Sequence, residues 1–180
     1  MTLRFWGTDT TADTPDGTNH FAPAVGALSD GGYVVAWQNA ASGASFQRFD
    51  AFGNPVGSVT DLPVVYKSGL GGFQSDLSVT GLADGNFIVG FQDDNGTNSP
   101  NTAAEEFDSS GNFLKTYFID STVADTSAPA TASYGNGWVE ATESGGNIYF
   151  ATGTSNGTLG AAKAVNTLTT ANSDQPAVAT

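Results

Sequence analysis

The chain contains no cysteine, few basic residues and a single histidine. The absence of cysteine excludes disulfides, thiolate metal sites and a cysteine nucleophile. Five Lys and Arg stand against eighteen Asp and Glu, so the formal net charge is -13. Such a surface repels nucleic acid and anionic membranes, and we expect neither as a partner. No apolar run has the length of a membrane span, and the first residues lack a signal-peptide pattern, so we expect no membrane insertion.

Residues that favour tight turns and short strands are abundant in the chain. It has 23 glycines, whereas charged residues make up only 13% of the sequence. Aromatic residues account for 11%, including twelve Phe that can fill the space between sheets. This composition suits many short strands and suits long helices badly, so we expect an all-β protein.

Residues 23–57 contain four strand-like runs separated by turn signals, at residues 23–28, 32–38, 45–50 and from about residue 55. Asp30 and Gly31 predict a tight two-residue hairpin, because both tolerate positive φ. Asp50 stands three residues before a glycine in the next turn, and we expect its carboxylate to accept backbone N–H groups there. Weaker copies follow: Phe87 and then Trp138 take the place of Tyr33.

The copies divide the chain into units at about residues 20–73, 74–124 and 125–170, with partial strands at 1–8 and 174–180. We treat residues 1–180 as a single β-repeat domain. A period of about 50 residues with four antiparallel strands predicts propeller-like repeats, and a β-sandwich is the alternative. We expect that this chain alone does not close a ring. It is then either a homo-oligomer or part of a longer repeat array.

The strings PAVGALSDGGYVVAW, FQRFDAFGNPVG and DQPAVAT resemble repeats in large secreted bacterial proteins of the RTX type, the hemolysin-like calcium-binding and adhesin-like group. The first unit matches closely, the second moderately and the third poorly. The resemblance implies a secreted, extracellular, bacterial and calcium-rich setting. The Gly- and Asp-rich nonapeptide that binds calcium in such proteins has no copy in this chain, so the resemblance assigns calcium to no residue.

The loop after the second unit's second strand is the most oxygen-rich run. It contains Asp93, Asp94, Asn95 and Asn98, which we name as candidate ligand-binding residues. Hard cations such as Ca²⁺ prefer carboxylate and carbonyl oxygens, so Asp93 and Asp94 are also weak metal candidates; a solvated loop is the alternative. Trp6 has no equivalent in the repeats, and we expect it to lie on the surface, where it could stack on a sugar ring. We expect no cofactor other than possible calcium.

No catalytic constellation stands out in the sequence. His20 could act as a general base, but no Ser stands in a recognisable nucleophile setting, so we interpret it as a surface or inter-unit residue. Glu140 and Glu143 offer carboxylates, as do Glu105 and Glu106, but adjacent residues of a strand point to opposite faces. We therefore predict that the chain is not an enzyme.

These observations favour a non-enzymatic extracellular repeat module that serves as a scaffold or adhesion surface. We expect its partner to be a protein or glycan surface. The alternative is a lectin-like carbohydrate-binding domain.

Overall fold

A computed structural model describes residues 11–13, 17–40, 43–63, 74–93, 101–119, 126–166 and 175–179. In these residues the regular structure is entirely β, and no helix long and apolar enough to cross a membrane is present. Sheet 1 consists of β1 (His20–Ala27), β2 (Tyr33–Asn39), β3 (Gly43–Phe49) and β4 (Pro55–Asp61). Sheet 2 consists of β5 (Gln74–Gly81), β6 (Phe87–Asp93), β7 (Asn101–Phe107) and β8 (Phe113–Phe118). Sheet 3 consists of β9 (Ser127–Tyr134), β10 (Gly137–Ser144), β11 (Asn147–Thr154) and β12 (Lys163–Ala164).

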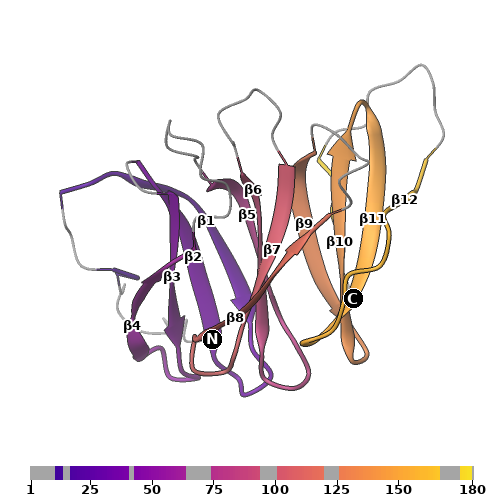
Figure 1. Cartoon of the computed structure of the whole chain (residues 1–180). Coiled ribbons are helices and arrows are strands. Elements are labelled where there is room, and N and C mark those ends of the chain that lie inside the picture. The colour runs from indigo at the N-terminus through magenta and orange to yellow at the C-terminus, as the bar shows by residue number, and fades with distance from the viewer. Residues whose placement is uncertain are drawn as a thin grey trace, which may run out of the picture.

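Each sheet is an antiparallel meander in which the four strands follow one another in chain order. The three sheets stand side by side in chain order (Figure 1). The first strands β1, β5 and β9 contact one another in sequence, so they lie along one common axis. The prediction of propeller-like four-stranded repeats is confirmed, and the sandwich alternative is wrong. Across the described residues the sheets do not close into a ring.

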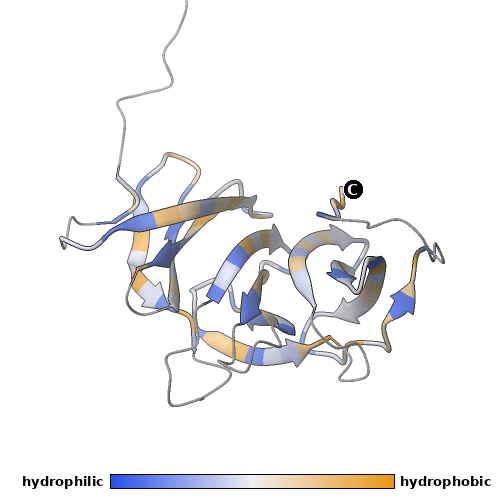
Figure 2. Cartoon of the chain, turned by 90° about the horizontal axis from the view of Figure 1, so that it is seen from above, coloured by the Kyte–Doolittle hydropathy of each residue, from blue (hydrophilic) through white to orange (hydrophobic). Residues whose placement is uncertain are grey.

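Hydrophobic side chains fill the two spaces between neighbouring sheets. Figure 2 shows the chain coloured by hydropathy, with hydrophobic segments in all three sheets. Between sheets 1 and 2, the ring of Phe46 meets Phe87 and Phe107 edge-on. Between sheets 2 and 3, the fully buried Trp138 packs edge-on against Tyr117. Phe87 and Trp138 therefore occupy the same place, each facing the preceding sheet. Tyr33 stacks on Phe49 on the outer face of sheet 1 and is partly exposed.

The β1–β2 hairpin is looser than the predicted two-residue turn. Leu28 N donates to Gly32 O at 2.8 Å, and Gly31 N donates to Leu28 O at 3.1 Å, so the loop is residues 29–31. Gly31 has a φ of 86°, which residues with a side chain rarely adopt. Asp30 accepts from Gly32 N at 2.9 Å and pairs with Arg48, so its role in the turn is structural.

The turns between the third and fourth strands of sheets 1 and 2 share one hydrogen-bond pattern. Asp50 accepts from Phe52 N and Asn54 N through Oδ1, and from the Asn54 side chain through Oδ2. Asp108 makes the same bonds with Ser110 and Asn112. The predicted role of the Asp50 carboxylate in its turn is confirmed, and Asp108 has the same role in the next sheet.

Backbone contact between β1 and β5 brings the innermost strands close together. A Cβ built on Gly81 would lie 2.2 Å from the carbonyl oxygen of Ala27, so this place requires glycine. Between β5 and β9, Thr80 Oγ1 donates to Thr131 O at 2.9 Å. Glycine on one side and threonine hydroxyls on the other thus fix the spacing of the sheets at the axis.

Candidate functional site

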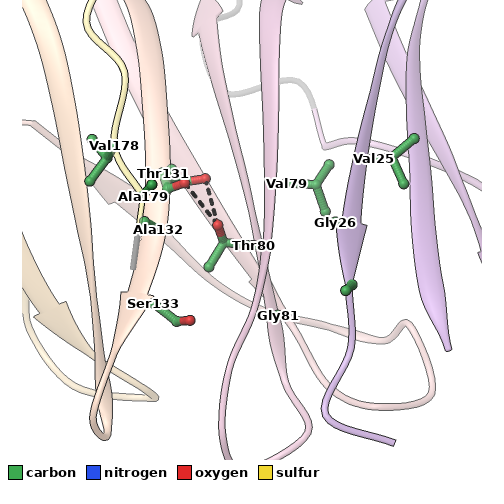
Figure 3. Close-up of a pocket in the computed structure, with 11 residues that line it drawn as sticks. Val25, Gly26, Val79, Thr80, Gly81, Thr131, Ala132, Ser133, Val178 and Ala179 are labelled. Carbon is green, nitrogen blue, oxygen red and sulfur yellow. Dashed lines mark hydrogen bonds between the residues drawn. The ribbon is translucent and has the colours of Figure 1, made fainter. Parts of the chain in front are cut away.

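A groove of about 520 Å³ runs along the axis (Figure 3). Residues 25–27 of β1, 79–81 of β5, 131–133 of β9 and 178–179 line it. None of these side chains is ionisable. The groove therefore offers small apolar groups, hydroxyls and backbone atoms, but no group for acid–base chemistry at neutral pH.

A smaller pocket of about 150 Å³ lies on the outer side of sheet 1, where β1 begins. Its apolar wall includes Phe21, Pro23 and Trp37, and its polar wall is formed by Asp13 and His20. The His20 and Trp37 rings lie 6.0 Å apart between centroids, at an interplanar angle of 41°. The pocket therefore combines an aromatic surface with two groups that form hydrogen bonds, the usual make-up of a small-molecule site.

His20 is held on both ring nitrogens. Nδ1 lies 2.5 Å from Asp13 Oδ2, and Nε2 lies 2.7 Å from Thr18 Oγ1. When the ring is neutral with its proton on Nδ1, Nδ1 donates to Asp13 and Nε2 accepts from the Thr18 hydroxyl. A carboxylate that orients an imidazole, which in turn contacts a hydroxyl, is an arrangement able to transfer a proton. Trp37 Nε1, buried in the same wall, has no acceptor within the described part of the chain.

Three of the four carboxylates considered for glycoside hydrolysis, Glu105, Glu106 and Glu140, lie elsewhere, in the spaces between sheets, whereas Glu143 is partly exposed and binds Ser127 Oγ and Gly146 N. Glu105 and Glu106 point to opposite faces of sheet 2, as expected, and both are fully buried. Glu106 accepts hydrogen bonds from Tyr117 Oη, Ser155 Oγ and other groups at the junction with sheet 3. Glu140, on the face of sheet 3 toward sheet 2, is also fully buried. These three buried side chains are out of reach of a substrate.

Burial changes the proton affinity of two of these groups. Removal from water, together with the charge of Asp93, raises the pKa of Glu105 to about 8. Burial raises the pKa of Glu140 to about 8. A side-chain hydrogen bond, with Thr116 for Glu105 and with Thr102 for Glu140, acts to lower each pKa, but burial outweighs it, so the protonated form of both carboxyls is favoured at neutral pH.

The residues that the sequence named for ligand binding do not form a described site. Asp93 is the last residue of β6 and is buried, not a loop residue exposed to solvent. Asp94, Asn95, Asn98 and Trp6 lie outside the described residues. Within the described ranges, no group of three or more His, Asp or Glu residues is arranged to hold a metal ion.

Sequence reasoning named His20 but missed its partners. Thr18 lies two residues before His20, a spacing that places two side chains on the same side of an extended chain. That signal was available, whereas the return of Asp13 toward β1 leaves no mark in the sequence. The pocket depends on this return, so it could be found only from the structure.

No family model and no curated protein matches the chain. Among solved structures, it is similar to a neuraminidase-like protein from A/bat/Guatemala/164/2009, with 14% identity, a TM-score of 0.52, and coverage of 76% of this chain and 37% of that one. It is also similar to the GH43 endo-arabinanase from Bacillus licheniformis, with 17% identity, a TM-score of 0.50, and coverage of 87% of this chain and 61% of that one. The chain thus spans less than two thirds of each neighbour, and the likeness shows the propeller fold.

The comparison contradicts the prediction that the chain is not an enzyme. The endo-arabinanase is an enzyme, and its fold is similar to that of this chain. The lack of a nucleophile motif in the sequence excluded one class of catalyst, and it was wrong to extend that exclusion to catalysis in general.

Proposed function

We propose that this chain is a carbohydrate-acting propeller module, and that the pocket beside His20 holds a sugar ring. The observation that carries the proposal is the meeting of Trp37, His20 and Asp13 at one small cavity. Sugar rings present apolar C–H faces and hydroxyl edges, which match an aromatic wall and a polar wall. The kinship of the fold to a GH43 endo-arabinanase supports the choice of carbohydrate over other small molecules.

The polar wall suits an uncharged or cationic ligand better than an anionic one. Asp13 contributes a carboxylate, and the whole chain carries a formal charge of -13, so the field around the pocket is negative. We therefore place neutral sugars, such as arabinose or glucose units, ahead of sialic acid.

The test is calorimetric titration with neutral oligosaccharides, including arabino-oligosaccharides, and with sialyllactose as the anionic comparison. Release of reducing ends, measured in parallel, reports any hydrolysis. We expect binding of a neutral sugar that weakens at least about tenfold in His20→Ala, which corresponds to about 1.4 kcal/mol. Phe118→Ser, which changes an exposed aromatic on β8 away from the pocket, serves as the matched control. Absence of sugar binding, or equal affinity in both variants, would refute the proposal.

An extracellular bacterial location is retained as part of the proposal. It rests on the resemblance of residues 23–57 to repeats of secreted proteins, and it would bring the pocket into contact with surface glycans. Immunodetection in culture medium and in cell fractions tests it. Confinement of the protein to the cell interior would count against it.

A further inference from the structure

Each innermost strand carries one residue in the left-handed region of φ and ψ. These residues are Ala22 with φ 49, Asp76 with φ 50 and Ala128 with φ 50. A non-glycine residue with positive φ is uncommon, and here each one lies where the pairing with the next strand shifts register. Gln175 has φ 53 and, like Ala22 and Ala128, precedes a proline. Gln175 thus repeats the backbone conformation of Ala22, Asp76 and Ala128.

The axial groove gives the same alignment independently. Counted from the left-handed residue, the lining residues stand at the same places in every strand: 25–27, 79–81, 131–133 and 178–179. Figure 3 shows Val178 and Ala179 beside Thr131 and Ala132 of β9. Residues 175–179 therefore occupy the position of an innermost strand next to sheet 3.

The outer face of sheet 3 has the composition of a face that packs against another sheet. The strand pairing places Phe150 of sheet 3 at the position that Phe46 has in sheet 1. It places Val139 at the position of Val34 in sheet 1 and of Ile88 in sheet 2. Phe46 is 1% exposed, and Val34 and Ile88 are 0% exposed, between sheets. Phe150 and Val139, in contrast, are only partly buried. The same apolar positions are thus covered in sheets 1 and 2 and incompletely covered in sheet 3.

The two internal interfaces also show what would cover this face. In sheet 2, the stacked rings of Phe87 and Phe107, 5.3 Å apart at 16°, receive the edge of Phe46. In sheet 1, Tyr33 and Phe49 form an equivalent stack, 5.0 Å apart at 12°. A stacked aromatic pair of this kind is therefore the natural counterpart of Phe150.

We propose that the outer face of sheet 3 and the segment 175–179 together form a docking surface for three further antiparallel strands of the same repeat. These strands complete a fourth sheet whose first strand is residues 175–179. The second strand pairs with Val178 as β2 pairs with Val25, and the aromatic pair of the new sheet packs on Phe150. A repeat sheet is stabilised by its neighbours, so completion of the fourth sheet stabilises sheet 3.

The experiment supplies three such strands with a sequence taken from the chain itself. Residues 176–180 align with residues 23–27, so a copy of residues 28–62 placed after Thr180 continues the repeat without a break. The control carries the same 28–62 residues in scrambled order. We expect the intact extension to resist protease and to lower the unfolding equilibrium constant at least about tenfold relative to the control.

A second variant tests whether the gain in stability comes from contacts with the outer face of sheet 3. Phe150→Ser should raise the unfolding constant more in the extended chain than in the original chain, because its ring gains partners only in the former. An extension that is digested, or equal effects of Phe150→Ser in the two chains, would overturn the proposal. The proposal would also be overturned if the original chain formed a dimer that dissociates on Phe150→Ser, because the surface would then bind a second copy of the chain.

Discussion

The ring of Phe46 in β3 meets the ring of Phe107 in β7 edge-on, with centroids 4.7 Å apart and planes at 64°. Both side chains are almost fully buried, and Phe87 completes the cluster at 5.3 Å from Phe46. The contact joins two different sheets, so it contributes to their association and not to either hydrogen-bond ladder. The cohesion of neighbouring sheets therefore depends on a small number of large rings.

Truncation of this contact should weaken the whole domain. We expect Phe46→Ala to lower the free energy of unfolding by about 3–5 kcal/mol, because it leaves a cavity against two buried rings. Urea denaturation followed by far-ultraviolet circular dichroism measures the change. Phe52→Ala removes a phenylalanine that is 91% exposed and should have little effect. Equal costs for the two variants would show that the inter-sheet cluster is not the source of stability.

Stability should fall between pH 5 and pH 8. The buried carboxyls of Glu105 and Glu140 have a pKa of about 8 in the folded chain against 4.5 when exposed. In this window the folded chain binds more protons than the unfolded chain, so the free energy of unfolding decreases as pH rises. The loss is on the order of a few kcal/mol per group. Urea midpoints at pH 5, 6.5 and 8 measure it.

Glu140→Gln provides the decisive comparison for this pH dependence. The amide cannot ionise, so the variant should be more stable than the parent at pH 8 and should show a shallower pH dependence. Asp76→Asn removes a carboxylate from an exposed position and serves as the matched change of charge. If both variants flatten the profile equally, general charge repulsion is the cause and the buried carboxyl is not.

The carboxylate of Asp108, which closes the turn between β7 and β8, should contribute to the loss of stability at acidic pH. Partial burial acts to raise the pKa of Asp108, but hydrogen bonds from Asn112, Ser110 and Gly111 outweigh it and lower the pKa below 3.8. A lowered folded pKa stabilises the chain above the unfolded value, and the contribution disappears as pH falls through the folded pKa. Asp108→Asn should therefore lower the urea midpoint at pH 7 and make the decline from pH 4 to pH 2 shallower. An unchanged decline would exclude the turn as a source of acid sensitivity.

The close approach of β1 and β5 should be sensitive to a single methyl group. A Cβ on Gly81 would lie 2.2 Å from a backbone oxygen, which cannot move aside without displacing β1. We expect Gly81→Ala to lower the free energy of unfolding by about 1–3 kcal/mol. Gly160→Ala is the control, since the nearest atom to its Cβ would be 3.4 Å away. Thermal unfolding of the two variants side by side tests the difference.

Periodicity in the sequence was sufficient to find the sheets. Tyr33, Phe87 and Trp138 were aligned from the pattern alone, and the structure places them on equivalent faces. Alternation of apolar and polar residues fixes which face is buried, and a repeated alternation fixes the repeat. The loop of the first hairpin was misjudged because Asp-Gly suits both a two-residue turn and the bulged turn found at Gly31.

The candidate site could not be predicted from the pattern of residues in the sequence. The sequence drew attention to the acidic run that begins at Asp93, because density of oxygen atoms is visible in a one-dimensional string. It could not show that Asp93 ends a strand and points between sheets. The pocket at His20 depends on Asp13, seven residues away in a segment without periodicity, so only three-dimensional proximity reveals it.

The left-handed residue near the start of every innermost strand affects how such a protein can gain or lose repeats in evolution. Because each repeat begins with the same local bend, a duplicated stretch of gene that encodes one whole repeat enters the array already in phase. Its first strand reaches the axis at the same angle as its neighbours. Insertion or loss of part of a repeat would break that phase, so we expect related chains to differ by whole sheets.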